Sequence, residues 1–166
     1  MTDRPAPIVY RPIGRIRTPF TDIDGMPIQP TAAAGVRGTI EIDPVYVDGL
    51  LDLGGFSHLI LLYHLHEAGE PRLVVTPFLD ASPYGIFATR SPARPNPVGI
   101  STVRLVGLGC STIEIEDVDM LDGTPLLDIK PYVPAFDDRP GASIGWFAGR
   151  LDRLVDARSD GRFRRG

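Results

Sequence analysis

The chain has only one cysteine, Cys110, among its 166 residues. A single cysteine excludes an internal disulfide and any metal site built from several thiolates, and it is typical of a reducing compartment. Long apolar runs are also missing: the longest, residues 59–63, is far too short to span a bilayer. The first 20 residues lack the apolar segment of a secretory signal peptide. We therefore expect a cytoplasmic protein with no membrane association.

Several common catalytic patterns are absent as well. The sequence has no P-loop, no His-Glu-x-x-His and no Gly-x-Ser-x-Gly. It also lacks the alternation of strands with long helices, and the glycine-rich turn after the first strand, that a Rossmann dehydrogenase or methyltransferase shows. The one candidate, residues 107–109, lies between two strand patterns and predicts a hairpin turn. These absences exclude the commonest nucleotide-binding enzyme classes.

Lysine is nearly absent: the chain has one lysine, Lys130, and 16 arginines. The net charge is −4. The charge is unevenly spread: residues 1–17 hold four arginines against one aspartate, and residues 150–166 hold six against three. Basic ends on an acidic body could contact RNA phosphates. The alternative is a solvated tail, and we expect one domain over residues 1–157 followed by a basic, flexible segment, 158–166.

Glycine and proline, 18 and 17 residues, favour many strands joined by tight turns. Strand patterns cover residues 13–17, 38–42, 56–66, 73–77, 98–106, 112–116 and 126–129. A short helix is expected after Asp43, as its N-cap, with Pro44 in the first turn. A longer helix is expected over residues 143–155. The sequence thus predicts an all-β, single-domain fold, a barrel or a sandwich, with a few short helices.

The best strand pattern, residues 56–66, predicts a barrel wall. Its odd positions are apolar, whereas His58, His64 and His66 share the other face. Paired histidines such as His64 and His66 could bind a metal, but no carboxylate or cysteine lies at a suitable spacing. We therefore expect no metal.

Residues 85–101 are the most informative segment. Thr89, Arg90, Arg94 and Asn96 are interspersed with three prolines. Proline fixes φ, so this loop is stiff, and arginine forks on a stiff loop suit a polar ligand. The alternative is a proline-rich surface connection. A second turn, residues 122–125, begins Asp-Gly, which leaves backbone groups available to a ligand or simply joins two strands.

The segment at 85–101 resembles the TsaA/YaeB-like family of TrmO-type tRNA methyltransferases. Three other segments match the family in order: residues 13–20, 55–59 and 122–132. The resemblance implies a non-Rossmann β-barrel that acts as a homodimer and binds S-adenosylmethionine near the subunit interface. The implied reaction is N6-methylation of threonylcarbamoyl-adenosine in the tRNA anticodon loop.

The resemblance also implies where the methyl donor binds. Cofactor contacts carried over from the family are Ile28, Gln29, Pro30, Leu65, His66, Arg90, Ile100, Leu121, Asp122, Gly123 and Thr124. We expect Arg90 to pair with the donor's carboxylate. The candidate catalytic residues are Arg94 and Asn96, which could orient the acceptor, and Asp122 or His66, which could accept a proton.

The chain departs from the family pattern in two ways. Ile28 stands where tRNA enzymes of the family commonly have arginine, and Leu65 stands where they have an aromatic residue. The chain also ends where those enzymes continue into a C-terminal domain that grips tRNA. Two further hypotheses therefore stay open: a methyltransferase of the same fold acting on a small molecule, and a sensor barrel that binds S-adenosylmethionine without turnover.

Overall fold

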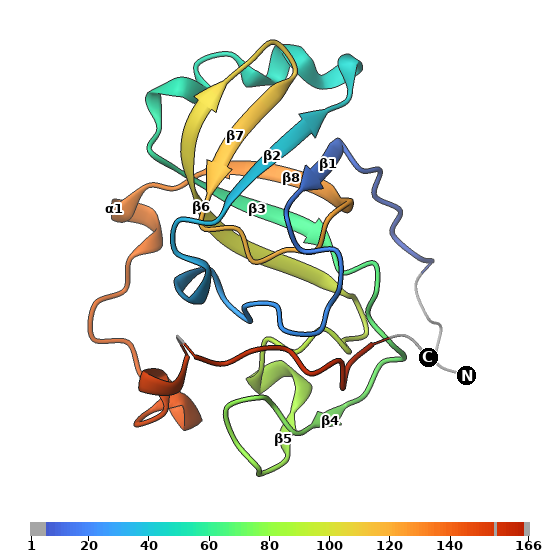
Figure 1. Cartoon of the computed structure of the whole chain (residues 1–166), viewed down its shortest axis with the longest axis vertical. Coiled ribbons are helices and arrows are strands. Elements are labelled where there is room, and N and C mark those ends of the chain that lie inside the picture. Colours follow the sequence, from blue (N-terminus) through green and yellow to red (C-terminus); the bar gives the residue numbers. More distant parts are fainter. Residues whose placement is uncertain (1–5, 155, 165–166) are drawn as a thin grey trace.

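Six antiparallel strands close into a barrel in this computed structural model, which describes residues 6–154 and 156–164 (Figure 1). The strand order around the barrel is β1-β2-β7-β6-β3-β8, and the pairing of β8 with β1 completes the circle. The strands are β1 (Gly14–Arg17), β2 (Arg37–Ile42), β3 (His58–His64), β6 (Val98–Leu108), β7 (Thr112–Glu116) and β8 (Thr124–Pro131). The all-β barrel expected from the sequence is confirmed.

Period-two alternation explains how these strands enclose a core. In β3, Leu59, Leu61 and Tyr63 are buried, whereas the residues between them face outward. Every strand of the barrel contributes inward side chains in this way. The large fully buried side chains of the barrel core are Ile16, Ile40, Leu59, Leu61, Val103, Ile113, Ile115, Val118, Met120 and Leu126.

Two glycines permit close approaches that shape the barrel. A Cβ on Gly14 would lie 2.1 Å from the carbonyl oxygen of Glu41, so β1 can approach β2 only with glycine at this position. Gly99 pairs with Tyr63 across β6 and β3, and a Cβ there would lie 2.2 Å from the Tyr63 ring. The missing side chain lets the tyrosine ring lie flat across β6.

The remaining elements are short. Strands β4 (Val74–Val75) and β5 (Tyr84–Gly85) form a separate two-stranded ladder. One α-helical turn, α1, covers Pro134–Asp137. Short 3-10 turns span Pro30–Ala33, Pro44–Leu50, Leu53–Gly55, Ile86–Ala88, Gly145–Phe147 and Leu151–Arg153. No helix in the described part of the chain is long and apolar enough to cross a membrane.

Several local predictions were wrong. The helix expected over residues 143–155 is instead two 3-10 turns, because Gly145 and Gly149 adopt positive φ angles of 55° and 72° that an α-helix cannot contain; residue 155 lies outside the described residues. The short helix expected after Asp43 is present as a 3-10 helix with Asp43 at its N-cap position and Pro44 in its first turn, but the Asp43 side chain makes no capping bond. The expected strand at 73–77 is only two residues long, and the hairpin turn falls at residues 109–111 rather than 107–109.

The C-terminal segment, residues 156–164, lies along the barrel end and joins two loops (Figure 1). The backbone of Ser159 bonds to Gly25 and Met26, at 2.8 and 2.9 Å, and Gly69 donates to the carbonyl of Phe163 at 2.9 Å. Phe163 is buried, with its ring edge-on to Phe78. The sequence predicts a flexible tail here, whereas residues 156–164 are packed; residues 165–166 lie outside the described part, and the domain division at 157 stays a prediction.

Candidate functional site

A cavity of about 870 Å³ opens at the barrel end where β3 finishes and β6 and β8 begin. We call it the barrel-end cavity. Its walls come from segments far apart in the sequence: residues 26–29, 65–68, 77–79, 88–92, 98–100, 119–121 and 143–147, with further single residues, among them Tyr63, Arg94, Thr124, Leu151, Leu154, Ser159 and Phe163. The volume falls in the range of small-molecule and cofactor sites. Because the lining is mainly apolar, a few polar side chains define its chemistry.

The proline-rich loop borders this cavity and is held together by Arg94. The Arg94 guanidinium donates to the carbonyl of Thr89 at 2.7 Å and to those of Ile86 and Ser91 at 3.4 Å. The Thr89 hydroxyl donates to the Ile86 carbonyl at 2.9 Å. Arg94 lines the cavity, but its guanidinium is already engaged in these bonds, which fix the loop. Asn96, the other expected acceptor-orienting residue, is exposed and lies outside the cavity lining.

Arg90 and Gln29 meet at the cavity wall. The Arg90 guanidinium donates to the Gln29 side-chain oxygen at 3.2 Å, which links the loop after the first strand to the proline-rich loop. Ile28 lines the cavity beside them, whereas Pro30 begins a 3-10 turn and is not part of the lining. An exposed guanidinium has five donors in a planar fork, which suits a carboxylate.

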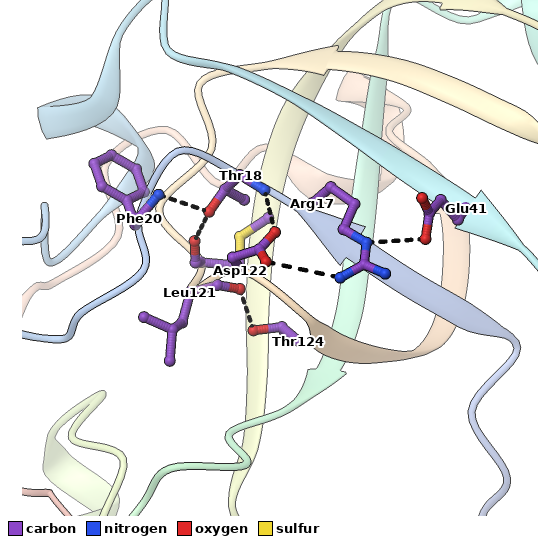
Figure 2. Close-up of polar contacts among 8 residues, drawn as sticks. Arg17, Thr18, Phe20, Glu41, Leu121, Asp122 and Thr124 are labelled. Carbon is purple, nitrogen blue, oxygen red and sulfur yellow. Dashed lines mark hydrogen bonds and ion pairs between the residues drawn. The ribbon is translucent and has the colours of Figure 1, made fainter.

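The Asp-Gly-Thr turn contributes its flanks to the cavity. Leu121 and Thr124 line it, and the Thr124 hydroxyl donates to the Leu121 carbonyl at 2.6 Å. Asp122 accepts a bond from the Thr18 amide at 3.1 Å, and its other oxygen lies 3.7 Å from Arg17 (Figure 2). Gly123 has a φ of 76°. Asp122 and Gly123 are outside the lining, so the structure uses them to anchor this turn to β1.

Leu65 and His66 follow β3 and line the cavity together with Ile100 from β6. The Leu65 amide donates to the carbonyl of Pro97 at 2.8 Å, which joins the end of β3 to the proline-rich loop. His64 is exposed. Among residues 6–154 and 156–164, no group of three or more histidine, cysteine or carboxylate side chains is arranged to hold a metal ion.

A hydrogen-bonded chain that the sequence analysis missed lies in the same cavity. The Ser101 hydroxyl donates to Asp119 at 2.7 Å, and the Tyr63 hydroxyl lies 2.9 Å from the Ser101 hydroxyl. Burial raises the pKa of Asp119 to about 6, against the opposing effects of the Ser101 bond and the Arg90 charge. Burial also raises the pKa of Tyr63. A signal was present: Ser101 is polar at an inward position of β6, between Gly99 and Val103.

The C-terminal region closes the cavity with aromatic and aliphatic side chains. Trp146 is sandwiched between Tyr84 and Phe147, with ring centroids 4.6 and 4.0 Å away. Its indole nitrogen donates to the Ala88 carbonyl at 2.7 Å. Leu151 adds to this wall. Apolar residues that suggested one helix, Ile144, Phe147, Leu151 and Leu154, therefore line the cavity from an irregular segment.

Taken together, the fold and the cavity define a small closed β-barrel with a mainly apolar cavity at one end, in which a few polar groups are placed. Residues 15–138 match the family model described as the tRNA-methyltransferase O N-terminal domain. The match covers most of the chain, and the chain belongs to this family. The resemblance inferred from the four sequence segments is confirmed.

The relatives are consistent with this assignment. A probable S-adenosyl-L-methionine-binding protein of Pyrococcus abyssi is 52% identical over 159 residues, which is 96% of this chain and 86% of that protein. The tRNA (adenine(37)-N6)-methyltransferase of Escherichia coli K12 is 35% identical over 147 residues, covering 82% of this chain and 63% of the enzyme. A crystal structure of TrmO from Pseudomonas aeruginosa superposes with a TM-score of 0.72 at 38% identity, over 85% of this chain and 62% of that one. This chain thus spans about three fifths of the TrmO chain.

Proposed function

We propose that the protein is an S-adenosylmethionine-dependent methyltransferase that methylates N6 of threonylcarbamoyl-adenosine in the anticodon loop of tRNA. One observation carries the proposal: segments from four separate parts of the family-matched region converge on one cavity of about 870 Å³. The names of the relatives support the donor and the reaction, because they include S-adenosyl-L-methionine-binding proteins and a tRNA adenine-N6-methyltransferase.

In this proposal the donor lies against the polar groups of the barrel-end cavity. Arg90, steadied by Gln29, pairs with the donor's carboxylate. The remaining contacts come from Ile28, Leu65, His66, Ile100, Leu121 and Thr124, all of which line the cavity. Asp122, Gly123 and Pro30 act indirectly, by shaping the segments that carry these residues.

The methyl group of a sulfonium is already activated, so the protein's main task is to hold donor and acceptor in line. His66, at the cavity wall, is the candidate to accept the acceptor's proton. Arg94 contributes by holding the loop that carries Arg90. Asn96, which is exposed beside the cavity, remains available to an acceptor that docks from outside.

The acceptor and the assembly complete the proposal. Two arginines of the basic C-terminal segment are paired within the chain, Arg162 with Asp160 and Arg164 with Asp22. A small-molecule acceptor is the second candidate. For assembly we propose a homodimer, because apolar side chains next to the cavity are exposed: Val98, Ile100 and Phe87 at 43%, 51% and 78%. Light scattering on the purified protein tests the dimer.

Labelled S-adenosylmethionine and two tRNA preparations test the reaction. One tRNA comes from cells that make threonylcarbamoyl-adenosine and the other from cells that do not. Label entering only the first establishes donor and acceptor together. Arg90→Ala should lose donor binding, whereas Arg139→Ala, an exposed arginine outside the cavity lining, is the matched control. Donor binding without label in either tRNA would overturn the tRNA acceptor and favour a small molecule or a sensor.

A further inference from the structure

The polar chain of Tyr63, Ser101 and Asp119 is the part of the barrel-end cavity that the proposed function does not use. Three separate segments hold it: β3, β6 and the connection after β7. The Ser101 hydroxyl donates to one oxygen of Asp119, and the Tyr63 hydroxyl lies against Ser101. Gly99 leaves room for the tyrosine ring that completes the chain. The carboxylate is therefore fixed in place at the cavity wall.

No ion pair compensates this carboxylate within the described residues. Four other charged or titratable groups besides Tyr63 line the cavity: His66, Glu67, Arg90 and Arg94. Arg90 bonds to Gln29 and Arg94 bonds to loop carbonyls, so neither makes a direct contact with Asp119. Burying an unpaired carboxylate in a mainly apolar cavity costs free energy, and a ligand with a positive charge recovers it.

We propose that Asp119 is the counter-anion of the donor's sulfonium and thereby makes the cavity prefer S-adenosylmethionine to S-adenosylhomocysteine. This inference rests on the proposed function. The amino-acid end of the donor has its own opposite charges and suits Arg90, and the adenosine is neutral. The sulfonium alone brings an uncompensated positive charge to the interior of the cavity.

The same charge distinguishes donor from product. In methyl transfer the acceptor nitrogen forms a bond to the methyl carbon, the carbon–sulfur electron pair returns to sulfur, and the nitrogen's proton passes to His66 and from there to solvent. The product is thus neutral at sulfur. It loses its attraction to Asp119 and leaves a buried charge unpaired again, which favours its exchange for new donor.

Titration calorimetry with S-adenosylmethionine and S-adenosylhomocysteine tests the proposal at pH 8. Asp119→Asn keeps the shape and an oxygen that can accept from Ser101, but it removes the charge. It should weaken donor binding tenfold or more, leave product binding equal or tighter, and so abolish the preference. Glu67→Gln is the control, because it removes the same charge from an exposed position on the same cavity. It should keep the preference within about twofold, since exposed charges are well screened.

Lowering the pH provides a second readout with the unmodified protein. Only ionised Asp119 attracts the sulfonium. With a pKa of about 6 in the empty cavity, the ratio of donor to product affinity should fall roughly tenfold between pH 8 and pH 5. The donor's other groups are shared with the product and cancel in the ratio. His66 lines the same cavity, and its protonation would also repel a cation. Because Asp119→Asn keeps His66, a flat ratio in this variant assigns the pH dependence to Asp119.

Three results would overturn the inference: equal losses for both ligands in Asp119→Asn, an unchanged preference in that variant, or a pH-dependent ratio that persists without the carboxylate and so belongs to His66. All three presuppose that the unmodified protein binds the donor. If it binds neither ligand, the proposed function itself fails.

Discussion

The unpaired carboxylate of Asp119 makes a prediction about stability that needs no ligand. Its pKa is about 6 in the folded protein and near 3.8 for an ordinary aspartate. Between these values the folded state binds more protons than the unfolded state, so stability falls as pH rises through this window and stays lower above it. Asparagine is neutral throughout. Asp119→Asn should therefore stabilise the empty protein at pH 8, and the gain should disappear near pH 4.

The magnitude follows from the shift in pKa. A shift of roughly two units corresponds to about 3 kcal/mol at 1.36 kcal/mol per unit. Water entering the cavity reduces this, so we expect a gain of about 1–3 kcal/mol at pH 8. For a chain of this length each 1 kcal/mol raises the melting temperature by about 2–4 °C. The hydrogen bond from Ser101 to the Oδ1 position can persist in the variant.

Urea denaturation of both proteins at pH 8 and at pH 4 measures the difference. The other titrating groups are common to both proteins and cancel in the comparison. A gain equal at the two pH values would mean that burial of charge is not its source. A loss at pH 8 would mean that the carboxylate already has a favourable partner. Either result would refute the electrostatic reasoning, in which the Asp119 carboxylate that destabilises the empty protein is also the group that makes it prefer the donor.

Three other substitutions test the packing that positions the site. Gly99→Ala should cost about 2 kcal/mol or more in urea denaturation, because its Cβ would overlap the Tyr63 ring; Gly85→Ala, with open space around the Cβ, should be neutral within about 0.5 kcal/mol. Glu116→Gln should lower the free energy of unfolding by about 1–2 kcal/mol, because the buried carboxylate bridges Arg37 and Arg104. Glu114→Gln, at an exposed position on the same strand, is its control. Equal effects of the two substitutions would contradict a stabilising bridge at Glu116. Phe163→Ala should lower the free energy of unfolding by about 2–4 kcal/mol and make residues 156–164 sensitive to proteases. Phe136→Ala, at a side chain that is 69% exposed, is the control and should have neither effect. If residues 156–164 stay protected in Phe163→Ala, Phe163 is not their anchor.

Period-two patterns predicted an all-β fold but left a barrel and a sandwich open, and the family resemblance favoured the barrel. Alternation in residues 56–66 and 112–116 identified two walls and which side chains face inward, because a strand buried on one face must alternate. The same reasoning failed for residues 143–155. Apolar side chains at helical spacing there line a cavity, although the segment that carries them is irregular. The two positive-φ glycines that prevent a helix give no clear signal in a sequence rich in glycine.

The candidate site was predictable only where a loop could be recognised from its residues. Arg90 and the loop that carries it were found in this way. For the Ser101–Asp119 pair the sequence carried only the signal of a polar residue at an inward strand position. The meaning of the pair depends on Tyr63, which is distant in sequence and is brought near by pairing of β3 with β6. Arg94 and Asp122 were predicted as site residues from their chemistry, but the sequence could not show that their partners include carbonyls and a backbone amide of the chain itself.

The C-terminal segment connects the barrel to the candidate donor site in a way that can be tested. Ser159 bonds through its backbone to Gly25 and Met26, three residues before Gln29, which in turn receives the bond from Arg90. The segment that fixes this loop lies beyond residue 138, where the match to the family model ends. Donor affinity should therefore depend on a segment that contributes none of the proposed donor contacts.

Ser159→Pro removes the amide that donates to the Met26 carbonyl at 2.9 Å and leaves the barrel strands untouched. Freed from one of its two bonds, the loop at residues 25–29 must be ordered by the ligand, which costs about 1 kcal/mol for each residue fixed. Donor affinity should fall fivefold or more in titration calorimetry, with little change in the urea midpoint of the barrel. Ser159→Ala keeps the backbone bond and should bind like the unmodified protein. If Ser159→Pro binds the donor normally, the segment serves only as a wall of the cavity, and the order of the Gln29 loop comes from the barrel alone.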